Sequence, residues 1–242
     1  MRRPGGYLSA TRHPWSCLLF LVPLIVVYEA GVVWLGGPQP ELLRNGADTW
    51  LRWGLESFGL SQLYCAPALI VAVFLAWSLL RLSDRPYNAL GVWVGMTCES
   101  VACAVGLWAL SKELGPVLED FGIRLNVGMD SKTLGRVITY VGAGIYEELL
   151  FRLALFFVLG IILRLIGVPR LLTVLLVGIL SALVFAAAHH LGPYGEPADR
   201  YVFLFRTFAG LYFALLYQLR GFGVAVGAHA CYDVLVGVLM VQ

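Results

Sequence analysis

The sequence predicts an all-α protein, a polytopic bundle of about seven (six to eight) membrane-spanning helices. Of its 242 residues, 60% are hydrophobic and only 13% are charged, and the mean hydropathy is +0.81. So few charges cannot give a soluble domain of this length its polar surface. The net charge of +2 supplies no basic surface for a polyanion, so we expect a lipid bilayer around the chain and no nucleic-acid partner.

Seven apolar segments are long enough to serve as spans, because a helix needs about 20 mostly apolar residues to cross a bilayer. They cover residues 15–35, 62–82, 89–110, 134–163, 171–189, 202–218 and 222–240. The fourth segment is too long for one straight span. We therefore expect it to be tilted, kinked near Gly142 or Gly144, or broken into two pieces.

The first segment resembles a signal peptide, since Arg2, Arg3 and Arg12 precede its apolar stretch. No convincing small-residue cleavage site follows, and Glu29 interrupts the stretch. We interpret it as a retained first span with its N-terminus in the cytoplasm. The basic residues of the loops favour the same orientation, because the inner side holds eight of them and the outer loops about seven. Those on the inner side are Arg2, Arg3, Arg12, Arg81, Arg85, Arg164, Arg170 and Arg220, beside one acid, Asp84.

The segment that follows the first span, residues 38–61, alternates apolar and charged side chains. Its apolar members are Trp50, Leu51, Trp53 and Leu55, and its charged members are Arg44, Asp48, Arg52 and Glu56. This mixture is typical of an amphipathic helix that lies in the membrane interface. We expect such a helix between the first and second spans.

Ionisable residues inside the apolar segments indicate where function lies, because moving a charge into hydrocarbon costs several kcal/mol. They are Glu29, Glu99, Glu147, Glu148, Arg152, His189, His190, Arg206, His229 and Asp233. Glu29 and Glu99 stand apart from the others, and we expect hydrogen bonds between helices from them. Most of the rest form three groups on separate segments.

The first group contains Glu147, Glu148 and Arg152. On a helix Glu148 and Arg152 share one face, four residues apart, in the order that favours a charge pair. Glu147 is rotated by about 100° from that face and is left without this partner. The asymmetry predicts that Glu148 and Arg152 form an internal brace and that Glu147 is free to act as a general base. A cluster of charges beside the membrane is the alternative interpretation.

The second and third groups each place a histidine four residues from a partner. Phe185 stands one helical turn before His189, and three alanines between them allow close approach of another chain. His229 shares a helical face with Asp233, which can hold the tautomer and orientation of the imidazole. Alone, the first pair is also compatible with an interfacial histidine and the second with a hydrogen bond between helices.

Together, Glu147, His189, His229 and Asp233 fit two hydrolytic chemistries. In one, Glu147 activates water with help from His189, and His229 stabilises the oxyanion that forms when the water attacks an amide. In the other, the two histidines and one or both carboxylates bind a catalytic zinc ion with an open position for water. The sequence leaves both open.

The three groups have the form Glu-Glu-x-x-x-Arg at 147–152, Phe-x-x-x-His at 185–189 and His-x-x-x-Asp at 229–233. In this order they resemble the motifs of the CAAX protease and bacteriocin-processing (CPBP, or Abi) family of intramembrane proteases, whose third motif ends in Asn or Asp. The resemblance covers roughly residues 130–240. It divides the chain into N-terminal helices with an interfacial segment, residues 1–125, and a protease core, residues 126–242.

The resemblance implies roles for the motif residues. Glu147 and His189 would bind and activate the attacking water, and His229 with Asp233 would form the oxyanion site. Glu148, Arg152 and Phe185 would support them. The glutamate mechanism of the family requires no metal cofactor, with zinc as the alternative. An ionised Asp233 would repel an oxyanion, so it must be protonated, orient His229 from behind, or bind a metal.

The resemblance also implies an intramembrane endopeptidase that acts on a membrane-associated protein or peptide. The family offers prenylated C-terminal tails, as for CAAX prenyl protease type 2, as well as bacteriocin precursors and sorting signals. We expect an integral protein of a prokaryotic cell membrane. A non-catalytic immunity or scaffold protein of the same fold is the alternative. A proton-coupled transporter is a further one, against which the absence of an inverted repeat counts.

Overall fold

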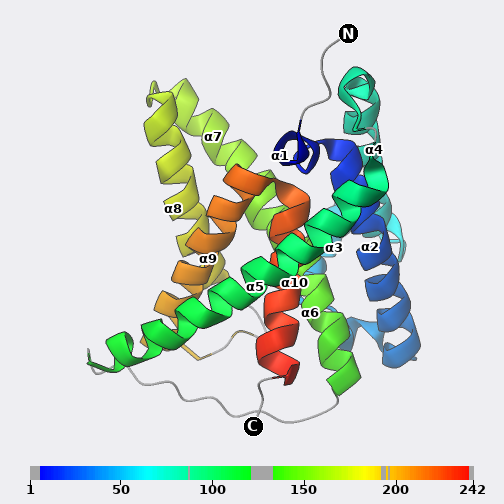
Figure 1. The fold of residues 1–242 in the computed structure, drawn as a ribbon. Helices are drawn as coiled ribbons and strands as arrows, with labels where there is room; N and C mark the ends of the chain where they lie inside the picture. The colour runs from blue at the N-terminus through cyan, green and yellow to red at the C-terminus, as the bar shows by residue number, and fades with distance from the viewer. Residues whose placement is uncertain (1–5, 87, 121–132, 192–194, 196, 240–242) are drawn as a thin grey trace.

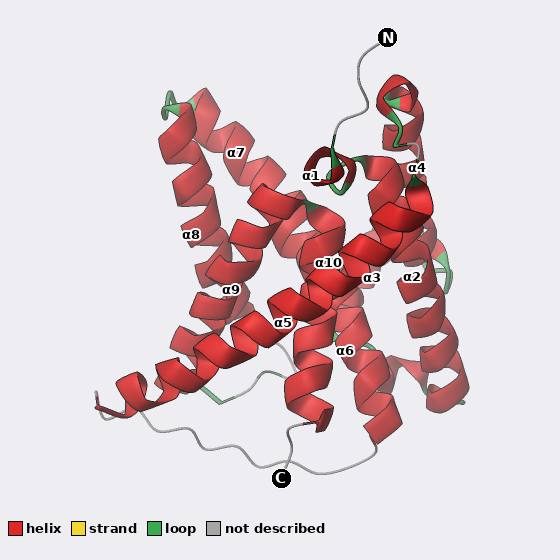
Figure 2. Cartoon of the chain, in the orientation of Figure 1, coloured by secondary structure: helices red, strands yellow, loops and turns green. Residues whose placement is uncertain are grey.

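The computed structural model describes residues 6–86, 88–120, 133–191, 195 and 197–239 (Figure 1). Within these residues all regular structure is helical and no strand occurs (Figure 2), which confirms the predicted class. The helices are α1 (Tyr7–Ala10), α2 (Pro14–Gly36), η1 (Pro40–Leu43), α3 (Gly46–Glu56), α4 (Cys65–Leu80), η2 (Leu82–Asp84), α5 (Ala89–Asp120), α6 (Thr133–Glu148), η3 (Leu149–Ala154), α7 (Leu155–Leu165), α8 (Arg170–Ala188), α9 (Arg200–Arg220), α10 (Phe222–Val234) and η4 (Leu235–Leu239).

Each of the seven predicted segments is helical, and the protein is a helical membrane bundle. Among the described residues, four helices are long and apolar enough to cross a membrane: Pro14–Gly36, Ala89–Glu113, Arg170–Ala188 and Arg200–Arg220. Cys65–Leu80 and Phe222–Val238 are shorter apolar helices. The predicted boundary between two parts of the chain, near residue 125, lies outside the described residues.

Local signals in the sequence set the ends of these helices. The imidazole Nδ1 of His13 accepts a hydrogen bond from the Trp15 amide at 3.2 Å, and Pro14 occupies the first position of α2, where a missing amide hydrogen costs nothing. Gly221 separates α9 from α10 with φ 95°, a left-handed conformation that glycine adopts without strain. The tight turn lets α9 and α10 pack as direct neighbours.

Helix α10 lies at the centre of the bundle and packs against α5, α6 and α9. Figure 1 shows α5 crossing it obliquely, with α2 and α4 on one side and α7, α8 and α9 on the other. Small residues make the approach to α6 close, because a Cβ atom at Gly144 would lie 2.7 Å from Ala230 Cβ and 2.9 Å from the Val226 carbonyl oxygen. The backbones of α6 and α10 therefore touch beside the first and third motifs.

The long fourth segment divides into α6, η3 and α7, and the change from α-helix falls after Glu148 rather than near Gly142 or Gly144. Both glycines lie inside α6, where Gly142 packs on the Tyr28 ring and Gly144 packs on α10. The irregular part is the π-helical stretch η3, directly after Glu148. A π-helical turn inserts an extra residue into the helical repeat and often marks a functional position.

The predicted segment 38–61 contains a helix, α3, preceded by η1. Three charged residues of this segment, Arg44, Asp48 and Arg52, turn inward toward Glu29 of α2, whereas Glu56 is exposed. They form a buried ring, here named the four-charge cluster, of Glu29, Arg44, Asp48 and Arg52. Arg44 lies 3.2 Å from Glu29 and 2.6 Å from Asp48, and Arg52 lies 2.8 Å and 2.7 Å from the same carboxylates. Glu29 thus has a structural role between helices, as expected.

Glu99 also bonds between helices. Its carboxylate accepts hydrogen bonds from the Arg220 guanidinium at the end of α9 and from the Tyr7 hydroxyl of α1, the latter at 2.8 Å. Burial and the Glu99 carboxylate together raise the pKa of Tyr7 to about 12. Both carboxylates outside the motifs therefore serve the packing of the bundle.

Candidate active site

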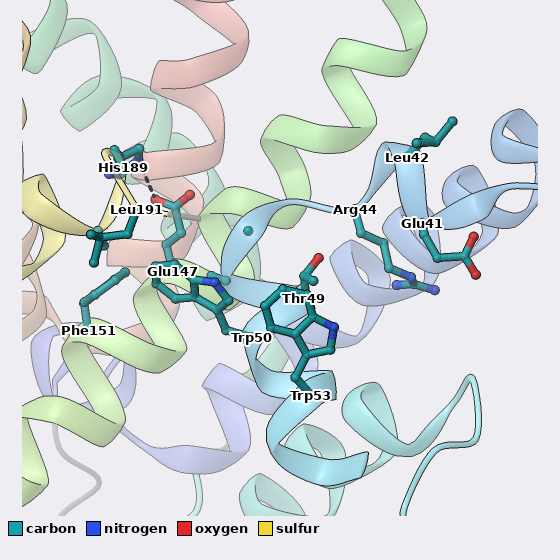
Figure 3. A pocket seen from close by; sticks show the side chains of 13 residues that line it. Glu41, Leu42, Arg44, Thr49, Trp50, Trp53, Glu147, Phe151, His189 and Leu191 are labelled. Carbon is teal, nitrogen blue, oxygen red and sulfur yellow. Dashed lines mark ion pairs between the residues drawn. The ribbon is translucent and has the colours of Figure 1, made fainter. Parts of the chain in front are cut away.

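Glu147, in the last turn of α6, lies between the two motif histidines. Its Oε2 atom is 3.6 Å from Nε2 of His189 and 3.7 Å from Nε2 of His229, and the contact with His189 is drawn in Figure 3. Its other oxygen, Oε1, accepts a hydrogen bond from Asn45 Nδ2 at 3.1 Å. Among the described residues Oε2 accepts no hydrogen bond. One carboxylate oxygen is thus tied, and the other faces two imidazoles.

Both imidazoles are oriented through their Nδ1 atoms. Nδ1 of His189 lies 2.8 Å from the Phe185 carbonyl oxygen one turn earlier, and Nδ1 of His229 lies 2.8 Å from Glu148 Oε1. A carbonyl and a carboxylate only accept hydrogen bonds, so each Nδ1 carries a proton and donates it. Both Nε2 atoms are therefore directed toward Glu147.

Glu148 and Arg152 form a fully buried pair, with Arg152 Nε 3.4 Å from Glu148 Oε2. Arg152 Nη2 also donates a hydrogen bond to the Gly210 carbonyl at 3.0 Å. Its guanidinium lies 4.5 Å from the centroid of the Phe185 ring, within the range of a cation–π contact. The brace predicted from the spacing is present, and it also reaches His229 through Glu148.

Phe185 and Phe213 enclose the two imidazoles. The Phe185 ring meets His189 edge to face at 4.8 Å between centroids. Phe213 of α9 stacks on His229 at 4.4 Å with an interplanar angle of 12°. Phe213 belongs to no motif and is missing from the residues predicted for the site. Its only signal in the sequence is that it is one aromatic residue among many in an apolar helix.

Asp233 lies on the same side of His229 as Glu147. Its Oδ2 atom is 3.5 Å from His229 Nε2, the nitrogen that faces Glu147, while Glu148 occupies the Nδ1 side. The expectation that Asp233 orients His229 from behind is therefore corrected, since Glu148 has that position. Asp233 lies one helical turn after His229, so its side chain reaches only the nearer nitrogen.

The structure brings the four predicted residues together through three contacts. Contacts of 3.5 to 3.7 Å join His189 to Glu147, Glu147 to His229, and His229 to Asp233. In the described part of the chain no group of three or more His, Cys, Asp or Glu side chains has the arrangement to hold a metal ion.

A cavity of about 370 Å³ opens beside Glu147 and His189. Figure 3 shows these two side chains at one part of its wall and the indoles of Trp50 and Trp53 from α3 at another. Glu41 and other residues of η1 also line it. The carboxylate is therefore reached through a partly aromatic cavity whose second wall comes from the N-terminal half of the chain.

The motifs and their geometry agree with a family comparison. Residues 130–235 match the family model described as type II CAAX prenyl endopeptidase Rce1-like. The match covers less than half of the chain. The matched region contains all three motifs, and it is similar in sequence to this family of proteases. No curated protein and no solved structure matches the chain.

The region that matches the Rce1-like model does not contain every residue of the site. Asn45, which contacts Glu147, and Trp50 and Trp53, which line the cavity, precede residue 130. None of the three was singled out for the site from the sequence. Asn45 had one local signal, its position before Gly46 at a helix start, where asparagine is a common N-cap.

Proposed function

We propose that the protein hydrolyses a peptide bond of a membrane-associated protein or peptide with a water molecule activated by Glu147 and His189. The observation that carries the proposal is the position of Glu147 Oε2, which faces the Nε2 atoms of both histidines while Oε1 is held by Asn45. A carboxylate oxygen beside an oriented imidazole is suited to hold water and to accept its proton.

In the proposed reaction Glu147 Oε2 accepts a proton from water as the water oxygen attacks the substrate carbonyl carbon. Because Nδ1 of His189 already donates to a carbonyl, its Nε2 lone pair is free to accept a hydrogen bond from the same water. The C–N bond of the tetrahedral intermediate then breaks, and Glu147 returns the proton to the leaving amine. General acid–base catalysis of this kind accelerates a reaction by about 10²- to 10⁴-fold.

His229 is proposed to stabilise the oxyanion with an Nε2–H group. Glu148 and Phe213 hold the ring at its Nδ1 atom and on its face, so the donor is preorganised. Asp233 Oδ2 lies 3.5 Å from that nitrogen and can accept a hydrogen bond from its N–H group before substrate binds. The substrate carbonyl oxygen replaces this acceptor in the reaction, so Asp233 acts through His229.

Purified protein in detergent micelles tests the proposal. We expect wild-type protein to cleave a membrane-associated peptide, and Glu147→Ala and His189→Ala to lose at least about 100-fold in kcat, since each removes a group that handles the water. Glu56→Ala is the matched control, because Glu56 is an exposed carboxylate at the end of α3. Equal cleavage by wild type and both site variants would refute the assignment.

The metal alternative has its own measurement. The proposed mechanism predicts less than one equivalent of zinc in protein purified without chelator, and unchanged cleavage after chelation. Stoichiometric zinc together with loss of activity on chelation, restored by added zinc, would replace Glu147 as general base by a metal-bound water.

The orientation and the host membrane are also part of the proposal. We propose that the protein resides in a prokaryotic cell membrane. Its N-terminus is placed in the cytoplasm, because the basic residues near the first span favour that side. A reporter that is active only in the cytoplasm, fused to the N-terminus, should be active. Activity of the opposite, externally active reporter at the same position would reverse the topology.

A further inference from the structure

Asn45, immediately before α3, lies outside the region that matches the family model. Its side chain contacts the Glu147 carboxylate inside that region. We propose that Asn45 is a positioning residue for Glu147, and that the loop before α3 therefore completes the active site. The inference rests on the proposed function, because it requires Glu147 to be the general base. It assigns a role in the site to residues that precede the three motifs.

The orientation of the Asn45 amide follows from its place as the N-cap of α3. Its Oδ1 atom accepts a hydrogen bond from the Asp48 backbone amide at 2.9 Å. Because a backbone N–H needs an acceptor, the side-chain atom that faces Asp48 must be the oxygen of the Asn45 amide. The remaining group, Nδ2, points to Glu147 Oε1 at 3.1 Å. The same side chain thus caps a helix and donates to the catalytic carboxylate.

The four-charge cluster fixes the position of Asn45. Asp48, three residues later, is held by Arg44 at 2.6 Å and Arg52 at 2.7 Å, and it also accepts a hydrogen bond from the Tyr28 hydroxyl at 2.9 Å. Asp48 is fully buried, so these charge-assisted contacts are shielded from solvent. The first turn of α3, and the amide that caps it, is consequently anchored against α2.

The same cluster also holds the residue that precedes Glu147. The Tyr146 hydroxyl donates a hydrogen bond to Glu29 Oε1 at 2.8 Å, and Glu29 pairs with Arg44 and Arg52. The position of Glu147 is therefore fixed in two ways. Its backbone is held through the neighbouring residue Tyr146, and its side chain is held by the hydrogen bond from Asn45. Both ties end in one buried group of charges.

This arrangement decides which oxygen of Glu147 acts as the base. A carboxylate rotates about its last side-chain bond within a broad range, so an untied Glu147 would present either oxygen at varied angles to the histidines. With Oε1 bound to Asn45, Oε2 stays directed at both Nε2 atoms. A displacement of about 1 Å in such a group can cost about 100-fold in rate.

Two substitutions separate the contact with Glu147 from the helix cap. Serine and aspartate cap helices as well as asparagine does. Asn45→Ser keeps a cap oxygen but is too short to reach Glu147, and Asn45→Asp keeps the length but places an acceptor where the donor stood. Asp199→Ser is the matched control, because Asp199 caps α9 by accepting a hydrogen bond from the Val202 amide at 2.9 Å and belongs to none of the three motifs.

We expect kcat to fall by about 10- to 100-fold in Asn45→Ser, the effect of losing a hydrogen bond to a charged acceptor. Asn45→Asp should lose more, since it brings an acceptor toward a carboxylate. KM should stay within about twofold and the Tm close to that of wild type, because the cap is retained. Asp199→Ser should match wild type in kcat. A purely structural role would instead lower Tm and leave the kcat of the folded fraction unchanged.

Wild-type kcat in both Asn45 variants would overturn the inference, as would a loss of activity fully explained by unfolding. Glu147→Gln, measured in the same assay, separates this outcome from failure of the proposed function. If Glu147→Gln is inactive and the Asn45 variants are fully active, only the positioning role is lost. If Glu147→Gln is fully active, the proposed function itself is wrong.

Discussion

Replacement of Glu148 by glutamine tests the buried pair that supports the site. Glu148 and Arg152 are both fully buried, 3.4 Å apart, and Glu148 also accepts the Nδ1 proton of His229 at 2.8 Å. Glu148→Gln keeps the shape of the side chain and removes its charge. It therefore leaves a buried guanidinium without its carboxylate and a histidine without its charged acceptor.

The expected loss of stability follows from the geometry. At an effective dielectric constant of about 20, two unit charges 3.4 Å apart attract by about 5 kcal/mol. Removal of one partner from a buried pair typically costs about 3 to 5 kcal/mol, because the other charge stays uncompensated. Arg152 keeps its hydrogen bond to the Gly210 carbonyl and its contact with Phe185. We therefore expect Glu148→Gln to lower the free energy of unfolding by about 3 to 5 kcal/mol.

A double-mutant cycle in mixed detergent micelles measures this loss. Unfolding is followed for wild type, Glu148→Gln, Arg152→Met and the double variant, with kcat measured on the same samples. The double variant should recover about 1 to 3 kcal/mol relative to the sum of the single changes, since no unpaired charge remains. Its kcat should stay low, because His229 Nδ1 still lacks a carboxylate acceptor.

Two results would refute this reasoning. A loss below about 1 kcal/mol for Glu148→Gln would show that the pair is solvated like a surface ion pair. Recovery of wild-type kcat in the double variant would show that Glu148 does not act on His229.

Three further changes probe other parts of the structure. Gly144→Ala should destabilise the fold by about 1 to 3 kcal/mol and reduce kcat, because its methyl group would meet Ala230 of α10 at 2.7 Å; unfolding and cleavage assays measure both. Burial lowers the pKa of His13. Below about pH 6.5 the unfolded chain therefore binds a proton at His13 more readily than the folded protein does, and the free energy of unfolding falls as the pH drops. His13→Asn, which retains a capping oxygen, should show a smaller fall in Tm over that range. Trp53→Ala should raise KM for a peptide and change kcat little, because Trp53 lines the cavity.

Each change has a matched control. Gly160→Ala should be neutral, since no atom lies within 4 Å of a Cβ at that position, and equal effects at the two glycines would contradict the close contact of α6 with α10. Equal acid sensitivity of wild type and His13→Asn would show that His13 does not titrate with unfolding. Trp34→Ala removes an exposed indole of α2, and an equal change in KM there would remove the role of Trp53.

The sequence was sufficient for the class of the fold and for the groups that meet in the site. Apolar segments of span length, and ionisable residues inside them, follow from the cost of placing charge in hydrocarbon. The pairing of Glu148 with Arg152 follows from helical periodicity, which is a local property. Both kinds of inference need only neighbouring residues or composition.

Contacts between distant segments could not be predicted in this way. Asn45 and Glu147 are 102 positions apart, and no periodicity links them. The i, i+4 spacing of His229 and Asp233 predicted their contact, but it could not reveal that Glu148 on another helix takes the Nδ1 side. The π-helical stretch η3 likewise depends on how α6 packs, since the glycines that were expected to kink the segment are used for close contacts.

The central claim is that Glu147 provides the base for peptide hydrolysis and is not needed for substrate binding. Its most direct test is Glu147→Gln, with cleavage and peptide affinity measured on the same folded protein. The account predicts a fall in kcat of at least about 100-fold with unchanged affinity and Tm. Cleavage at the wild-type rate, with the substitution verified in the purified protein, would contradict it.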